Sequence, residues 1–189
     1  MSRLALPPWP AFAPRCGAVR LRAVSDDDVE MARELSTDPY VPHVGSLPAH
    51  AHVAEAKAWI ERQRERFRSG AAYTFTITEA VGGRPVGHCA LTVRELAAGR
   101  ASAGYAIVPS CRGQGLVADA LGALTSFAWS LPGLDRIELL IEPWNIASVR
   151  TAERAGYSRE GLLRRYQEIA GERRDMLLYA ALAPRDGSS

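Results

Sequence analysis

The sequence predicts a single α/β (α+β) domain in which helices cover a mixed, mainly antiparallel sheet of seven strands. Seven segments carry the alternating or β-rich pattern of strands, and four carry helical periodicity. Their order is strand, two helices, three strands, helix, strand, helix and two strands. The segment 101–141 is a strand–helix–strand crossover, which makes its two strands parallel. A chain of 189 residues can bury the core of one such domain.

The first half of the chain begins with a proline-rich stretch, residues 1–17, which we expect to form an irregular arm. Ser25 or Asp26 is a suitable N-cap for the first helix. The expected elements that follow the arm are a strand at 19–24, a helix at 26–35, a loop at 37–48, a helix at 50–68, and a hairpin of strands at 73–78 and 86–93.

The second half alternates strands and helices before a final strand pair. Gly156 is a C-terminal signal for the last helix. No linker or repeat interrupts residues 18–182, so we expect one domain there and a flexible tail at 183–189. The expected elements are a strand at 101–108, a helix at 116–130, a strand at 136–141, a helix at 145–155, and strands at 158–168 and 173–182.

Composition excludes several function classes. A formal net charge of +2 lacks the basic excess of a nucleic-acid-binding protein. The cysteines Cys16, Cys89 and Cys111 are too few and too scattered for a disulfide framework, and no zinc-ligand spacing is present. No segment has the length of a membrane span or the form of a secretion signal. We therefore expect a cytoplasmic protein that uses no metal and binds neither nucleic acid nor membrane.

The most informative segment, 108–117, lies between a strand end and a helix start. Gly113 and Gly115 remove side chains where backbone amides can approach a ligand, and the helix N-terminus adds a partial positive charge. Such a turn suits a diphosphate. Arg112 can add donors or hold the loop. No Lys-Ser/Thr pair follows, and Ala118 stands where a dinucleotide fingerprint has its third glycine.

A second segment, Glu142–Ser148, follows the strand that runs parallel to the one before the glycine loop. Asn145 is a suitable N-cap, and Ser148 lies within the first turn of the next helix. Ligands of open α/β sheets lodge outside the carboxyl ends of parallel strands. The two segments are therefore expected to meet at one site.

Taken together, these motifs resemble the GNAT superfamily, and within it the branch of the ribosomal-protein N-alpha-acetyltransferases. The resemblance covers about residues 18–182. The residues that carry it are Arg112-Gly113-Gln114-Gly115, Asn145-x-x-Ser148, Gly156-Tyr157, Glu160-Gly161, Arg164 and Asp175.

The resemblance implies a GNAT fold with a splayed parallel strand pair, and an acetyl-CoA-dependent N-acetyltransferase that uses direct attack of an amine. Loop 112–117, which includes Leu116 and Val117, is expected to hold the diphosphate of acetyl-CoA. Ile107 and Val108 are expected to pair with the pantetheine arm. Asn145 is expected to contact the cofactor, and Ser148 to protonate the leaving thiolate.

The sequence departs from the family pattern at several catalytic positions. Ala152 stands where many members have a tyrosine acid, so Ser148 or water must serve. A glutamate on the penultimate strand falls at Gln167, with Glu168 adjacent. The general base is therefore open between Glu168, Glu142, a water chain and none. Trp144 is a candidate lining residue of the acceptor site.

The missing base bears on the choice of amine. An α-amino group with a pKa of about 7.8 is far more often neutral near pH 7 than a lysine amine with a pKa of about 10.4. The free energy of deprotonation differs between them by roughly 3.5 kcal/mol. We therefore expect a peptide N-terminus or a small amine of similar acidity. A non-catalytic acyl-CoA-binding module is the alternative, and an RNA-binding protein using the Arg-rich stretch 61–68 is a third reading. Relatives are frequently dimers, so a homodimer is an open expectation.

Overall fold

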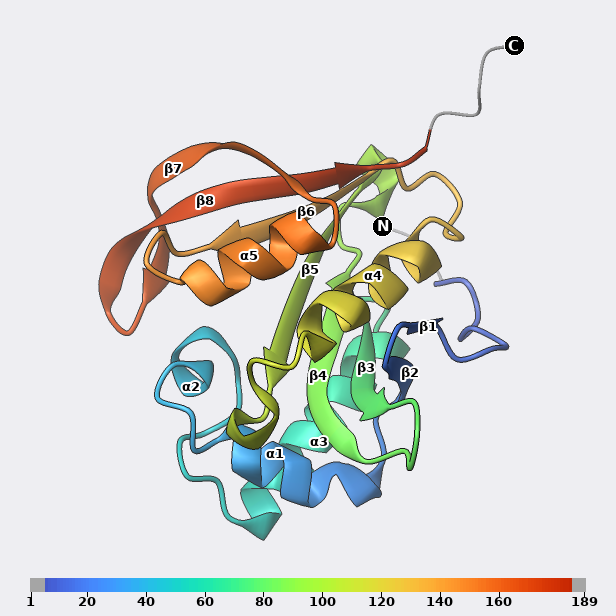
Figure 1. Cartoon of the computed structure of the whole chain (residues 1–189), viewed down its shortest axis with the longest axis vertical. Coiled ribbons are helices and arrows are strands. Elements are labelled where there is room, and N and C mark those ends of the chain that lie inside the picture. Colours follow the sequence, from blue (N-terminus) through green and yellow to red (C-terminus); the bar gives the residue numbers. More distant parts are fainter. Residues whose placement is uncertain (1–5, 185–189) are drawn as a thin grey trace.

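The computed structural model describes residues 6–184, which form one sheet of eight strands with helices on both faces (Figure 1). The strand order across the sheet is β1-β2-β3-β4-β5-β6-β8-β7. The strands are β1 (Arg15–Cys16), β2 (Val19–Ala23), β3 (Ala72–Glu79), β4 (Pro85–Thr92), β5 (Arg100–Ile107), β6 (Arg136–Ile141), β7 (Ser158–Ile169) and β8 (Glu172–Leu182). The α-helices are α1 (Val29–Leu35), α2 (Val41–Val44), α3 (Val53–Arg68), α4 (Leu116–Ala128) and α5 (Ile146–Arg154).

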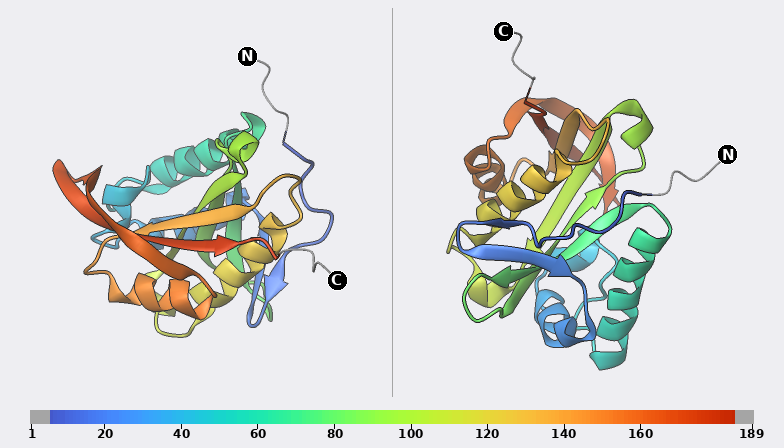
Figure 2. Two further views of the ribbon diagram at one scale, coloured as in Figure 1. Left: turned by 90° about the horizontal axis from the view of Figure 1, so that it is seen from above. Right: turned by 90° about the vertical axis from the view of Figure 1, so that its right-hand side faces the viewer.

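The helices divide between the two faces of the sheet. In the left view of Figure 2, α3 lies on one side of the sheet, and α4 and α5 lie on the other. Aromatic contacts follow this division, since Trp59 of α3 packs against His88 of β4, whereas Phe127 of α4 packs against Phe75 of β3. Alternate residues of the central strands are therefore buried on both faces.

The parallel pair β5–β6 is joined only at its beginning. Its register comprises Arg100↔Arg136, Ala101↔Ile137 and Ser102↔Glu138, whereas β5 runs on to Ile107 and β6 to Ile141. All other neighbouring strands are antiparallel. The sheet therefore splays between the carboxyl ends of β5 and β6, and this splay places the glycine loop and the Glu142–Ser148 segment at its wide end.

Two expectations about the element count were wrong. The sheet has eight strands instead of seven, because Arg15 and Cys16, within the expected irregular arm, pair with the edge of β2. A fifth α-helix, the single turn α2, lies inside the expected loop 37–48. The carboxylate of Asp38 makes this turn by accepting the backbone N–H groups of Tyr40 and Val41 at 2.7 and 2.8 Å.

The remaining elements agree with expectation to within a few residues. Ser25 caps the first helical segment, which begins as a 3₁₀ turn at Asp26–Asp28 before α1. The expected tail 183–189 and the arm 1–17 lie partly outside the described residues. Within the described part of the chain, no helix is both long enough and apolar enough to cross a membrane.

Candidate active site

The glycine loop presents a row of backbone amides that have no hydrogen-bond partner in the described part of the chain. Gly113 and Gly115 adopt left-handed φ values of 75° and 78°, a conformation that glycine reaches without steric cost, and Gly115 is the N-cap of α4. The N–H of Arg112 donates to the carbonyl of Pro109. Among the described residues, no carbonyl or side chain accepts a hydrogen bond from the N–H groups of 113–117. These amides, with the positive end of the α4 dipole, can receive a diphosphate.

The side chains of the loop have distinct positions. Leu116 is buried in the core and anchors the start of α4, Val117 is half-buried, and Gln114 is exposed. Arg112 does not point into the loop, because its guanidinium forms an ion pair with the buried carboxylate of Asp38. The loop is thus tied to the segment between α1 and α2.

A second arginine, which sequence reasoning missed, flanks the loop from α5. A Cβ placed on Gly115 would lie 3.0 Å from Nη1 of Arg154. Arg154 is exposed, and no carboxylate among the described residues forms an ion pair with it. Its spacing along α5 carried no signal, since only the packing of α5 beside α4 brings it to Gly115.

The edge of β5 has one free position at the wide end of the splay. The N–H of Val108 is already bound to the carbonyl of Val86 at 2.9 Å. Because backbone polar groups alternate sides along a strand, the N–H and C=O of Ile107 point away from β4 and toward the splay. Of the two residues expected to pair with a ligand, Ile107 has the free backbone groups.

The start of α5 supplies polar groups on the α4 side of the sheet. Asn145 caps the helix through its Oδ1, which accepts the Ser148 N–H at 3.1 Å. Its amide NH₂ remains free to donate. The carbonyl of Ser148 accepts a hydrogen bond from the Tyr105 hydroxyl at 3.3 Å, so a tyrosine that sequence reasoning had not singled out also lies in the splay. Burial raises the pKa of Tyr105, which keeps its proton at neutral pH.

Four side chains gather around Glu142 at the carboxyl end of β6, and we call them the Glu142 cluster: Tyr40, Glu142, Trp144 and Arg174. Glu142 is 3% exposed, and the closest charged group is the guanidinium of Arg174, with Nε 3.8 Å from Oε1. Burial raises the pKa of Tyr40, and the hydrogen bond and negative charge of Glu142 raise it further. The ring of Tyr40 meets that of Trp144 edge-on at 5.0 Å, and Trp144 is 59% exposed.

Glu168 lies elsewhere, near the tip of the β7–β8 hairpin. It pairs in the sheet with Arg173, and its exposed carboxylate forms an ion pair with that residue at 4.0 Å. Among the described residues, no hydrogen bond or ion pair joins its side chain to the Glu142 cluster. Of the two carboxylates considered as a base, Glu142 is the one that lies at the splay.

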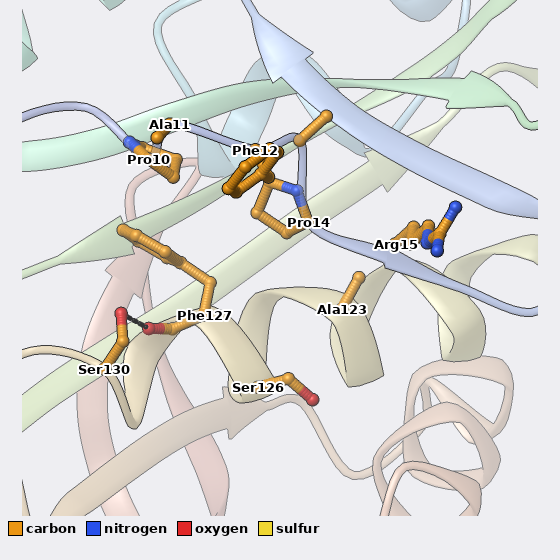
Figure 3. Close-up of a pocket in the computed structure, with 10 residues that line it drawn as sticks. Pro10, Ala11, Phe12, Pro14, Arg15, Ala123, Ser126, Phe127 and Ser130 are labelled. Carbon is orange, nitrogen blue, oxygen red and sulfur yellow. Dashed lines mark hydrogen bonds between the residues drawn. The ribbon is translucent and has the colours of Figure 1, made fainter.

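A separate apolar groove of ≈ 400 Å³ lies between the N-terminal arm and α4 (Figure 3). The hydroxyl of Ser130 in its wall donates to the carbonyl of Phe127 at 2.7 Å. No residue of the glycine loop or of the Glu142 cluster lines it. Within the described part, no three His, Cys, Asp or Glu residues are grouped so that they could hold a metal ion.

Comparison with known proteins agrees with this geometry. The family model of the acetyltransferase (GNAT) domain matches residues 18–158. An "Uncharacterized N-acetyltransferase p20" of Bacillus licheniformis is 25% identical over 162 residues, covering 86% of this chain and 91% of the relative. RimJ of Mycobacterium smegmatis, solved with a CoA disulfide, is 29% identical with a TM-score of 0.77 and covers 90% of this chain and 84% of its own.

Another solved structure has the same fold. RimL, a ribosomal L7/L12 alpha-N-protein acetyltransferase in complex with coenzyme A, has a TM-score of 0.77 at 20% identity, with 90% of this chain and 97% of that chain covered. Similar solved structures thus include Rim-type acetyltransferases, and two of them hold coenzyme A or its disulfide. This chain belongs to the GNAT acetyltransferase family and is an N-acetyltransferase.

Proposed function

We propose that the chain transfers the acetyl group of acetyl-CoA to an amine of low pKa, either a peptide N-terminus or a small molecule. The observation that carries this proposal is the juxtaposition of the free amides of 113–117 with the splay of β5 and β6. The amides of 113–117 fit a diphosphate, and the splay leaves the edge of β5 open for an extended pantetheine arm. The two are joined by the short connection between Ile107 and Gly113.

Different residues of the chain bind different parts of the cofactor. The amides of 113–117 and the guanidinium of Arg154 bind the diphosphate. The backbone groups of Ile107 pair with the pantetheine arm as a neighbouring strand would, and the amide NH₂ of Asn145 donates to the same arm. Ser148 gives a proton to the leaving sulfur. Acetyl-CoA supplies the thioester, and no metal takes part.

The acceptor is expected to enter beside the Glu142 cluster. Trp144 offers an exposed aromatic face next to Asn145, and Glu142 supplies a negative charge that attracts an ammonium group. Deprotonating a lysine amine costs roughly 3.5 kcal/mol more than deprotonating an α-amine, so an α-amine needs less help from the site to lose its proton.

The experiment compares two peptides of one sequence. One has a free N-terminus and an acetylated lysine, and the other has a blocked N-terminus and a free lysine. With acetyl-CoA, we expect thiol release and a mass increase of one acetyl group mainly with the first peptide. Faster acetylation of the lysine peptide would contradict the preferred amine. Uptake of acetyl-CoA without thiol release across peptides and small amines would instead indicate a non-catalytic acyl-CoA-binding module.

A further inference from the structure

The carboxylate of Glu142 has an unusual position for an acidic side chain. It is 3% exposed, yet its only ion pair within the described residues is a 3.8 Å contact with Arg174. Arg174 is also bound to Glu172 at 2.7 Å and is 43% exposed, so Glu142 shares a partner that solvent and another carboxylate already satisfy. The Tyr40 hydroxyl also hydrogen-bonds to Glu142. A buried carboxylate that is held by a tyrosine and a shared arginine at the end of a strand is a candidate functional group.

The register of the strands shows which face Glu142 addresses. Ala101 of β5 pairs with Ile137 of β6, and Tyr105 lies on the same face of β5 as Ala101, toward α4 and α5. Ile137, Leu139 and Ile141 alternate onto that face, so Glu142, directly after the end of β6, is placed toward the opposite face. The contact of Glu142 with Tyr40, from the α2 side, agrees with this direction. The splay therefore has Ser148 on one face and Glu142 on the other.

This arrangement separates the two proton transfers of an acyl transfer. An amine that approaches from the α2 face meets Glu142 first, while a sulfur leaving on the α5 face meets Ser148. In a direct attack the nitrogen adds to one face of the thioester carbonyl, and this addition needs the amine to be held close to the carbonyl carbon. The exposed ring of Trp144 lies beside the entry, within edge contact of Tyr40.

We propose that Glu142 is the general base of the reaction, and that it binds the acceptor ammonium between itself and the Tyr40–Trp144 pair. This inference rests on the proposed function, because it assigns a role within the same site. Glu142 takes one proton from the ammonium, and the freed lone pair of the nitrogen forms the new C–N bond. The C–S bond breaks with its electron pair going to sulfur. Ser148 protonates the sulfur and is reprotonated by the second proton from nitrogen, and the proton on Glu142 leaves to solvent.

Three polar groups lie around Glu142. They are the Tyr40 hydroxyl from the α2 segment and the Arg174 guanidinium from β8, with Glu172 beyond Arg174. Tyr40 keeps its proton, because burial and the adjacent carboxylate raise its pKa.

The test replaces Glu142 by glutamine, which keeps the shape and removes the base. We expect Glu142→Gln to lower kcat/KM by about 100-fold, as loss of a general base does. The variant reacts only with the neutral amine, so its kcat/KM should rise with pH through the pKa of the amine, whereas the wild type, in which Glu142 takes the proton of the bound ammonium, should not show this limb. The decrease in kcat/KM caused by Glu142→Gln should be larger for amines of higher pKa. CoA binding, measured by calorimetry, should be unchanged and shows that the variant is folded.

Glu168→Gln is the matched control, since it removes the other candidate carboxylate from an exposed site, and its kcat/KM and pH profile should equal those of the wild type. A Glu142→Gln enzyme with wild-type activity and the wild-type pH profile would overturn the assignment while leaving the proposed function intact. A wild-type enzyme that releases no thiol with any amine would overturn both. Should Glu142→Gln fail to bind CoA, Glu142→Asp serves. It should keep the wild-type pH profile with at least tenfold lower kcat/KM, and full wild-type activity would refute the role.

Discussion

Arg112 of the glycine loop and Asp38 of the α1–α2 connection form an ion pair across 74 residues of sequence. The same carboxylate accepts the backbone N–H groups of Tyr40 and Val41, so it fixes the segment that carries Tyr40 into the Glu142 cluster. The loop that is expected to bind the cofactor is therefore joined through one buried side chain to the wall of the expected acceptor site. Changes at Asp38 should affect the acceptor more than the cofactor.

Replacing Asp38 by asparagine should lower the free energy of unfolding at neutral pH by about 1 kcal/mol or more, because the ion pair with Arg112 is lost while the amide oxygen still accepts from the backbone. Chemical denaturation measures this value. The KM for the amine should rise, whereas the dissociation constant of CoA should change little. Glu30→Gln is the control, since it removes an exposed pair with Arg33 and should cost less than about 0.5 kcal/mol.

The contribution of Asp38 should also depend on pH. Burial alone would raise the pKa of Asp38, but the hydrogen bonds from Arg112, Val41 and Tyr40 and the charge of Arg112 together lower it below its ordinary value of 3.8. A depressed pKa in the folded state stabilises the fold above the ordinary pKa, and this stability is lost as the pH falls through the folded value. The difference in unfolding free energy between wild type and Asp38→Asn should therefore shrink below about pH 4. A difference that stays constant to pH 2 would argue against the ion pair.

Alanine at Gly113 should weaken CoA binding by at least tenfold. In the free protein, a Cβ at Gly113 meets nothing within 4 Å, so the folding penalty is only the strain of φ +75°, about 1–2 kcal/mol. A methyl group over the free amides would obstruct a diphosphate. Gly133→Ala is the matched control, because Gly133 has φ +77° and equally open surroundings in the turn before β6. Equal CoA affinities of the two variants would show that the ligand does not approach Gly113.

Arg154→Gln should weaken CoA binding by about tenfold, since a hydrogen bond to a charged group contributes roughly 1.5–3 kcal/mol. The dissociation constant should also depend less steeply on salt, because one cation no longer faces the phosphates. Arg150→Gln removes the same charge one turn earlier on α5 and is the control. If both substitutions weaken binding equally, the effect comes from the general positive charge of the helix and not from the position of Arg154 beside Gly115.

Local signals in the sequence were sufficient for much of the fold. The strand 136–141 was predicted with its observed bounds because Pro143 follows its apolar run and Gly133 precedes it. Asn145 was predicted as a cap, and its side chain accepts the N–H three residues later. In both cases the deciding interaction lies within a few residues of the element, so the local sequence is sufficient to predict it.

The elements that sequence analysis missed depend on distant partners. The stretch 37–48 has three prolines and one glycine, which favour a loop. The turn α2 nevertheless forms within it, where Asp38, paired with Arg112, accepts the N–H groups of Tyr40 and Val41. The choice between Glu142 and Glu168 is similar. Both are acidic residues near strand ends, so the sequence does not distinguish them. In the fold, the register of the β7–β8 hairpin places Glu168 near the exposed tip, whereas Glu142 is buried at the end of β6.

Ser148 and Tyr105 give the last prediction, because either could protonate the leaving sulfur. The Tyr105 hydroxyl donates to the carbonyl of Ser148 at 3.3 Å, so its proton is engaged in holding the first turn of α5. We therefore expect Ser148→Ala to lower kcat by 10- to 100-fold with CoA affinity unchanged. Tyr105→Phe should lower kcat less than threefold. Steady-state kinetics with calorimetric CoA binding measures both variants, and the reverse order of effects would make Tyr105 the acid and leave Ser148 as a cofactor contact.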